Sequence, residues 1–338
     1  MGSVGEVAGV RTAAQAAEYV ADDAEAMAYR STTVLTDLDR AADAVTDLLR
    51  ARITAVLADH PGPPGLMLSG GIDSILVAAV CADLGLQPQT LTVVTDVDGG
   101  LEDLRGRDVA ALLGFEHHVV DLDNERLAEA AAACIAALGT WELWEITSAI
   151  PVQAAFARFA DLGVGPVLTG AGSDALFLGG SRLAVEPDAP EAIDELRTRV
   201  RAKVTANFTR ERLIPDYYER LLDDRAEEFV QVFQTAAFWR FAMDTHPTLL
   251  WRPGPDGRGY DKAVLRHAAV RLGIPTELAW TVKSPLQVSS GVIGALAQSA
   301  RTDLAAQPHQ LTYEDPRTEP LEHTVVRMFL RGLSEGGR

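Results

Sequence analysis

One short turn constrains the fold of this chain more than any other segment. Residues 69–74 read Ser-Gly-Gly-Ile-Asp-Ser and lie between an apolar run at 65–68 and a longer one at 75–80. This order predicts a strand, a tight turn and a helix. The backbone N–H groups of such a turn, with the positive end of the helix, favour an anion, and a phosphate fits best. The glycines let it approach closely because they carry no Cβ.

Asp73 places a carboxylate in the first turn of the predicted helix. A carboxylate repels a phosphate unless a cation lies between them. The turn therefore predicts a phosphate together with Mg2+, which prefers hard oxygen ligands. The chain contains no Gly-x-x-x-x-Gly-Lys-[Ser/Thr] sequence, so a Walker-type loop is excluded. Taken alone, a glycine pair after a strand also has a purely structural interpretation.

Strand-like and helix-like segments alternate around this turn. Strands are expected at 66–68, 90–94, 118–122 and 166–169, and helices at 38–57, 74–84, 102–113, 124–138 and 148–162. The alternation predicts an α/β fold, with a parallel sheet covered by helices on both faces. Ligands of such sheets bind beyond the C-terminal ends of the strands, where residues 69–74 lie.

The pattern changes along the chain and suggests three parts. Residues 1–40 are expected to form an N-terminal helical segment, with a helix-like stretch at 12–29. Residues 41–295 form the main domain, whose helical part covers about 186–280, and residues 296–338 form a C-terminal tail. In the helical part we expect helices at 191–208, 216–243 and 261–272, with no buried strand between the first two.

Charge and composition exclude several classes of partner. The net charge of −18 argues against a nucleic-acid surface, which needs clustered Lys and Arg. No apolar run reaches the roughly 18 residues of a membrane span, and no signal peptide is evident. Cys81 and Cys134 lie in Ala-rich helical runs and are expected to be buried thiols rather than a disulfide or zinc ligands. These features predict a cytoplasmic location.

A second glycine turn follows the strand expected at 166–169. Residues 169–174 read Thr-Gly-Ala-Gly-Ser-Asp. Gly170-x-Gly172-x-x-Ala175 matches a dinucleotide-binding pattern, but Gly179-Gly180 would break the helix that this pattern needs. Alternatively, the two strands end side by side, and Asp73 and Asp174 bind one Mg2+ that bridges phosphates. Asp174 would also suit the start of a helix for structural reasons.

Together the two turns resemble the synthetase domain of asparagine synthetases and of the β-lactam-forming synthetases, which belong to the ATP pyrophosphatases. A third segment adds to the resemblance, with Asp-Lys-Ala-Val-Leu-Arg at 261–266, Trp-Thr-Val-Lys at 280–283 and Ser-Ser-Gly-Val at 289–292. The resemblance covers roughly residues 40–295. It implies that residues 41–295 form an ATP-binding synthetase domain of the adenine nucleotide α-hydrolase-like type.

The resemblance also implies a reaction between a small-molecule carboxylate and an amine or ammonia. The carboxylate attacks the α-phosphate of ATP to give an acyl-adenylate and pyrophosphate, and the amine then displaces AMP to form an amide. Lys283 would balance charge at the α-phosphate and at the later oxyanion. The implied nucleotide contacts are Leu68, Ser69, Gly70, Gly71, Asp73, Ser74, Val94, Thr169 and Gly170.

The chain departs from that family at three points. One is the segment at 245–253, which reads Thr-His-Pro-Thr-Leu-Leu-Trp-Arg-Pro where the family has an Arg-Val-Pro-Phe-Leu-Asp-like sequence. The family's glutaminase half has a cysteine directly after the initiator methionine, whereas Gly2 follows Met1 here. We therefore expect free ammonia, an amine substrate, an internal amine or a separate amidotransferase as the nitrogen source. A homodimer is an alternative to the amidotransferase partner. Residue 171 is alanine, where asparagine synthetases have glutamate and the β-lactam-forming enzymes have tyrosine. A base would have to come from elsewhere, and Glu142, Glu145 and Tyr260 are the candidates.

The main interpretation is an AMP-forming amide ligase of specialised metabolism. Two alternatives remain open from the sequence. One is a nucleotide-binding subunit that acts with a separate amidotransferase, which Ala171 favours. The other is a different transferase of the ATP pyrophosphatase type.

Overall fold

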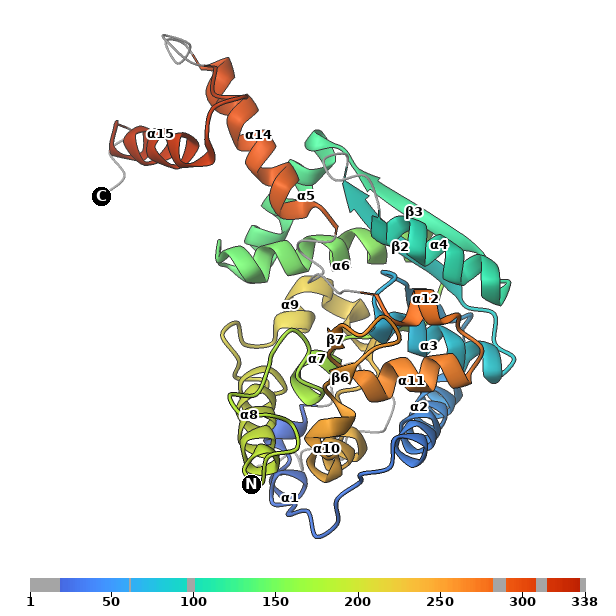
Figure 1. The fold of residues 1–338 in the computed structure, drawn as a ribbon. Coiled ribbons are helices and arrows are strands. Elements are labelled where there is room, and N and C mark those ends of the chain that lie inside the picture. Colours follow the sequence, from blue (N-terminus) through green and yellow to red (C-terminus); the bar gives the residue numbers. More distant parts are fainter. Residues whose placement is uncertain (1–18, 61, 96–100, 282–289, 308–314, 335–338) are drawn as a thin grey trace, which may run out of the picture.

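A five-stranded parallel sheet lies at the centre of the molecule (Figure 1). The computed structural model describes residues 19–60, 62–95, 101–281, 290–307 and 315–334, without the side chains of 101–104. The strands are β1 (Gly65–Met67), β2 (Gln89–Thr95), β3 (His117–Leu122), β4 (Val167–Thr169) and β5 (Phe229–Gln231), in the order β3-β2-β1-β4-β5. The predicted parallel α/β sheet is confirmed, because every pair of neighbouring strands is parallel.

Helices cover both faces of this sheet. On one face lie α3 (Ile72–Asp83) and α4 (Leu101–Leu113), and α2 (Leu38–Asp59) and α11 (Ala263–Arg271) pack outside α3. On the other face lie α5 (Asn124–Leu138) and α6 (Leu143–Asp161). Each face has its own cluster of buried apolar side chains. A parallel sheet needs this double cover because its strands are apolar on both sides.

The remaining elements lie outside this central sheet. They are η1 (Val20–Asp22), α1 (Ala24–Met27), α7 (Ser173–Leu176), α8 (Ala192–Asn207), α9 (Tyr217–Leu222), η2 (Asp223–Glu228), α10 (Ala236–Asp244), η3 (Pro247–Leu249), β6 (Arg252–Pro253), β7 (Gly259–Tyr260), α12 (Thr276–Ala279), α14 (Val292–Ala306) and α15 (Leu321–Ser334). Strands β6 and β7 form a separate antiparallel pair. Helices α14 and α15 extend away from the body of the molecule (Figure 1).

The helix expected over 216–243 is wrong. The chain there forms α9 and η2, then the fully buried strand β5, and only then α10. β5 extends the sheet beside β4, with Val167 opposite Phe229 and Thr169 opposite Gln231. A strand of three residues is too short to show a two-residue period, and its pairing partner lies about sixty residues away. Tertiary pairing therefore overrides the helical pattern of the surrounding sequence.

The helix-like stretch at 12–29 is also wrong where the structure describes it. Residues 20–27 form the short η1 and α1, and residues 12–18 lie outside the described residues. This segment is tied to the later part of the chain. The Tyr19 hydroxyl donates to Glu219 at 2.8 Å, and the Trp239 indole nitrogen donates to the Ala26 carbonyl at 2.9 Å.

The two cysteines are buried thiols, as expected from their sequence context. Cys81 and Cys134 are free and buried, and burial raises the pKa of each thiol to about 12. In the described ranges, we find no helix both long and apolar enough for a bilayer crossing.

Candidate active site

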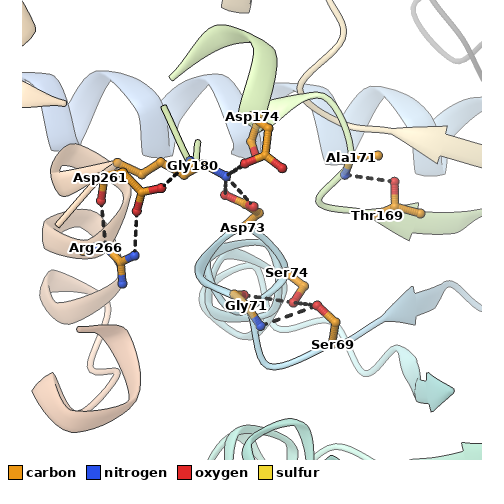
Figure 2. Close-up of polar contacts among 12 residues, drawn as sticks. Ser69, Gly71, Asp73, Ser74, Thr169, Ala171, Asp174, Gly180, Asp261 and Arg266 are labelled. Carbon is orange, nitrogen blue, oxygen red and sulfur yellow. Dashed lines mark hydrogen bonds and ion pairs between the residues drawn. The ribbon is translucent and has the colours of Figure 1, made fainter. Parts of the chain in front are cut away.

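The first glycine turn links β1 to α3 at the C-terminal edge of the sheet. Gly70 has a φ of 73°, a conformation that glycine adopts without strain. The Ser74 hydroxyl donates to the Gly71 carbonyl at 3.0 Å, and Ser69 Oγ lies 3.4 Å from both Ser74 Oγ and the Gly71 amide nitrogen (Figure 2). These contacts hold the turn at the N-terminus of α3, whose backbone N–H groups and dipole favour an anion.

The second glycine turn lies directly beside the first. β4 pairs with β1, so both turns leave the same edge of the sheet where the strand order reverses. The Ala171 amide donates to the Thr169 hydroxyl at 3.3 Å, and Gly172 has a φ of 95°. A Cβ at Gly170 would lie only 2.7 Å from Asp73 Cβ. The two turns therefore touch, and the expected neighbourhood of the two strands is confirmed.

A buried lysine joins the aspartates of the two turns. The Lys262 ammonium lies 2.6 and 2.7 Å from the two carboxylate oxygens of Asp73, 2.5 Å from Asp174 Oδ1 and 2.9 Å from Ser173 Oγ. The Lys262 side chain is fully buried, that of Asp73 is 9% exposed and that of Asp174 is 54% exposed. A buried ammonium needs such partners, since the protein interior solvates a lone charge poorly. One edge of this cluster is open to solvent through Asp174.

Lys262 is the residue that the sequence prediction missed, although its motif was recognised. It precedes α11 with a φ of 52°, in the left-handed region, and occupies the N-cap position. Ser, Thr, Asp, Asn and Gly are the usual residues at an N-cap. A lysine at this position is unusual, and this was the signal that could have identified Lys262. The close packing requires Gly179, because a Cβ there would lie 2.6 Å from Lys262 Cε.

The residues around Lys262 fix the start of α11. Arg266 is buried and donates to Asp261 Oδ1 at 2.9 Å, and Asp261 Oδ2 accepts the Gly180 amide at 2.8 Å (Figure 2). Arg266 also donates to the carbonyls of Ala279 and Thr281, at 2.8 and 2.9 Å. Through these contacts the start of α11 binds the segment that follows α7 at Gly180. It also binds the segment at residues 279–281. Lys283 follows this point and lies outside the described residues.

The two carboxylates suit a magnesium site of the predicted kind. Asp73 and Asp174 converge on one point, because oxygens of both lie within 2.7 Å of the same nitrogen. Among the described residues, no group of three or more His, Cys, Asp or Glu side chains could hold a metal ion. Mg2+ commonly takes one or two carboxylates and completes its shell with substrate phosphates and water, so this donor set fits it.

Two predicted nucleotide contacts lie on or directly after neighbouring strands near the first turn. Leu68 follows β1, and its side chain is fully buried in the core. Val94 lies on β2 and is partly buried. The Leu68 carbonyl accepts the Thr92 hydroxyl at 2.6 Å. Contact of Leu68 and Val94 with adenosine stays a prediction.

The three candidate bases lie in separate local contacts. Glu142 caps α6 by accepting the Glu145 amide at 2.8 Å. Glu145 forms an ion pair with Arg212 at 3.0 Å, in which both side chains are 14% exposed. The Tyr260 hydroxyl donates to Asp256 at 2.9 Å. The pKa of Tyr260 is raised, mainly by burial and to a smaller extent by this hydrogen bond. None of the polar contacts described for these three side chains joins the aspartates at Lys262.

Comparison with known proteins gives a consistent match over the region that carries both turns. A family model described as asparagine synthase matches residues 44–252. An asparagine synthetase [glutamine-hydrolyzing] from Lotus japonicus is 31% identical over 161 residues, which are 45% of this chain and 27% of the relative. Asparagine synthetase B from Escherichia coli is 26% identical over 176 residues, 47% of this chain and 32% of the relative.

The extent of these matches is partial. The chain spans about a quarter to a third of the length of the curated relatives that it matches. Among solved structures, an NH3-dependent NAD synthetase from Campylobacter jejuni matches with a TM-score of 0.32 and 17% identity, covering 43% of this chain and 61% of that one. The fold is defined by the sheet order and the helices that cover it, independently of this likeness.

Proposed function

Since this chain belongs to the asparagine synthase family, with a family match over residues 44–252, we propose that it is an ATP-dependent ligase that joins a carboxylate to an amine. One observation carries the proposal. Two glycine turns from neighbouring strands touch, and their aspartates, Asp73 and Asp174, converge at the Lys262 ammonium. This arrangement combines N–H groups for phosphates with carboxylates for a cation.

The first turn would bind the β- and γ-phosphates, which leave together as pyrophosphate. Ser69, Gly70, Gly71 and Ser74 surround the N-terminus of α3, so its N–H groups and dipole offset the negative charge of that leaving group. Thr169 and Gly170 would line the nucleotide from the second turn. Asp73 and Asp174 would hold Mg2+, which, when bound, neutralises charge on the phosphate oxygens.

Lys262 keeps the two aspartates in place before substrates bind. Without a cation between them, two carboxylates that face one point repel each other, and the ammonium removes this cost. The aspartates are therefore already held close to one another before a metal ion binds. We propose that Lys262 is a positioning residue for the metal-binding carboxylates.

The proposed chemistry proceeds in two steps. A carboxylate oxygen of the substrate attacks the α-phosphorus, the bond to the bridging oxygen breaks, and an acyl-adenylate and pyrophosphate form. The amine then attacks the acyl carbon, AMP leaves with the C–O bond electrons, and the amine loses a proton as the amide forms. Lys283 is proposed to stabilise negative charge in both steps. Ala171 cannot take the proton, and assignment of that role to Glu142, Glu145 or Tyr260 stays a prediction.

We further propose that the enzyme acts in specialised biosynthesis. Ala171 departs from both family patterns beside the acceptor side of the site, and its small side chain leaves room for a substrate larger than aspartate. Nitrogen would come from an amine substrate, free ammonia or a separate amidotransferase.

Pyrophosphate release is the direct test of this proposal. Purified protein is incubated with ATP and Mg2+ and with a panel of carboxylates and amines, and pyrophosphate, AMP and amide are measured. We expect release that requires a carboxylate and amide formation that requires both substrates. ATP cleavage to ADP and phosphate would contradict the proposed reaction.

The role of the aspartates is tested by substitutions that remove charge and keep shape. We expect Asp73→Asn and Asp174→Asn each to abolish turnover and to weaken Mg2+-dependent ATP binding in calorimetry, because each removes one anionic ligand. Asp83→Asn is the matched control, since Asp83 ends the same helix α3 and pairs with Arg50 at the surface. Turnover by the Asp73→Asn/Asp174→Asn double variant would exclude the metal role.

Ala171 supports a second candidate function. A synthetase-like subunit could bind Mg2+ and ATP, and depend on a separate amidotransferase partner for reaction. Nucleotide binding without turnover on any substrate pair, followed by turnover after a glutamine amidotransferase is added, would favour this subunit over the free-standing ligase.

A further inference from the structure

Lys203 is a second lysine near the aspartates that Lys262 joins. It lies on α8, which packs against α7 (Figure 1). Its side chain is half-buried, and its ammonium donates to Ser181 Oγ at 3.0 Å. None of the ion pairs found within the described ranges includes Lys203. Because an ammonium has three N–H donors, Lys203 can bind a further acceptor.

Ser181 belongs to the segment that directly follows α7, and this segment is fixed at two points. The Gly179 amide donates to the Asp174 carbonyl at 3.1 Å. The Gly180 amide donates to Asp261 Oδ2, at the start of α11, at 2.8 Å (Figure 2). The hydroxyl that contacts the α8 lysine is therefore held in place relative to both aspartates of the two turns.

The charges at the site act on Lys203. Its pKa is lowered, first by burial and then by repulsion from Lys262 and Arg199, while attraction by Asp174 opposes this change. Lys203 is therefore a partly desolvated cation among other cations. An anion bound at its ammonium would compensate both the burial and the repulsion.

A cavity beside Ser181 leaves room for such a ligand. Its charged lining residues are Arg182, Glu186 and Asp261. The carboxylate of Asp261 is already paired with Arg266 at 2.9 Å, and Glu186 is exposed to solvent. An anion at the Ser181 hydroxyl would thus have a second basic side chain, Arg182, in the same cavity.

The proposed leaving group needs more positive charge than the two turns and Lys262 supply. Asp73 and Asp174 would cancel the charge of one Mg2+, so Lys262 would leave only a single positive charge. The helix N-terminus at the first turn adds roughly half an elementary charge. Pyrophosphate carries several negative charges, and a second lysine would offset part of the remainder.

We propose, resting on the ligase function proposed for this chain, that Lys203 and Ser181 bind the terminal phosphate of ATP and then of the leaving pyrophosphate. The ammonium donates to a phosphate oxygen in a charge-assisted hydrogen bond. The Ser181 hydroxyl accepts from the ammonium and donates its own proton to the phosphate. The phosphate site then extends from the first turn past Asp174 to α8.

Calorimetric titration of the full chain with inorganic pyrophosphate and Mg2+ tests this subsite. We expect Lys203→Met to weaken pyrophosphate binding by about 10- to 100-fold, the range for one hydrogen bond between charged groups. Ser181→Ala should weaken it by a smaller factor, and Lys203→Arg, which keeps the charge, should retain most of the affinity. AMP binding should be the same in all of these proteins, because AMP lacks the terminal phosphate. Arg126→Gln is the matched control, since it removes a cation that is 68% exposed on α5.

The outcomes separate this subsite from the ligase function itself. Equal pyrophosphate affinity of Lys203→Met and the unchanged chain would overturn the subsite and leave the ligase function standing. A chain that binds no pyrophosphate before any substitution would overturn both. An effect of Lys203→Met confined to the KM of the carboxylate substrate would assign the anion to that substrate and overturn the phosphate assignment. If circular dichroism shows that Lys203→Met does not fold, Ser181→Ala decides, and unchanged affinity would then count against the subsite.

Discussion

Lys262 shows how one side chain can determine the state of a site. Its ammonium contacts the oxygens of three side chains, two of which are carboxylates. These contacts take the place of the hydrogen bonds that water would otherwise make. Removing one member of a buried ion pair is costly mainly because the other member stays buried without its partner. The contribution of Lys262 to stability should therefore depend on whether Asp73 is charged.

A double-mutant cycle measures this dependence. We expect Lys262→Met to destabilise the fold by roughly 3 kcal/mol, since Asp73 is left nearly buried and uncompensated. Lys262→Met combined with Asp73→Asn should be less destabilised than the sum of the two, with a coupling of about 1–3 kcal/mol. The measurement is urea unfolding of the four proteins without Mg2+ or nucleotide.

The exposed pair Arg271–Asp43 is the control for that cycle. Its side chains are 41% and 61% exposed, so water already solvates both charges. Arg271→Met and Asp43→Asn should couple by less than about 1 kcal/mol. Equal coupling in the two cycles would show that burial of Lys262 has no special effect.

Lys283 is the other lysine with an expected role, implied by its place in the Trp-Thr-Val-Lys segment. We expect Lys283→Ala to lower kcat by ~10²–10³, comparable to the loss of one oxyanion-stabilising group. The binding of ATP should change less, because we propose that the first turn binds the phosphates that leave as pyrophosphate. Steady-state kinetics and calorimetry separate these effects, and Arg271→Ala provides an exposed cation as the reference. A kcat close to normal would refute the role.

Among the loops and strands, the contact between the two glycine turns leaves no room for an added methyl group. A Cβ at Gly170 would lie 2.7 Å from Asp73 Cβ and 2.8 Å from the Ser74 nitrogen, both too close for ordinary contact. We expect Gly170→Ala to cost about 1–3 kcal/mol in urea unfolding, because one turn must move away from the other. ATP affinity should fall with it.

Gly71→Ala gives the matching stability control. A Cβ at Gly71 would meet only Ser69 Oγ, at 3.5 Å, which is ordinary contact distance. Its stability should stay near that of the unchanged chain, even if a methyl group there hinders a phosphate. If Gly170→Ala unfolds at the same urea concentration as Gly71→Ala, the two turns are not packed as described.

The elements differ in how far sequence reasoning could reach them. β1, β2 and α3 were predicted because each is a run of apolar residues with a clear end, as at residues 69–74. β5 was missed because three residues between an acidic turn and a helix carry no period of their own. Its strand state depends on pairing with β4. Residues far apart in sequence therefore decided the outcome there.

The residues of the candidate site also differ in whether the sequence alone could predict them. Both glycine turns and their aspartates were found, since these lie at strand ends where local pattern is informative. The junction at Lys262 was missed because it depends on how α11 docks against the turns, with a left-handed residue at its start. The candidate bases stay a prediction, and in the structure Glu142 contacts the α6 N-terminus while Glu145 pairs with Arg212.

For the molecule as a whole, the strongest electrostatic feature is its charge of −18. Repulsion among like charges opposes a compact state, and dissolved salt screens it over about 8 Å at physiological ionic strength. We expect the urea midpoint to rise when NaCl is increased from a few millimolar to about 0.15 M. Sodium sulfate and NaCl at equal ionic strength should separate screening from general salting-out. A midpoint that does not change with NaCl would argue against net repulsion.

The position of Lys262 has a consequence for the chain while it is being made. Lys262 and Asp73 are separated by 189 residues, and β4 must join β1 before the second turn can meet the first. A nascent chain that has left the ribosome only as far as residue 170 contains the first glycine turn. It still lacks Lys262 and the complete second turn. Such distant contacts form late in folding. Nucleotide would therefore bind and protect the nearly completed protein but not its earlier fragments, which would make ligand binding a late checkpoint of its synthesis.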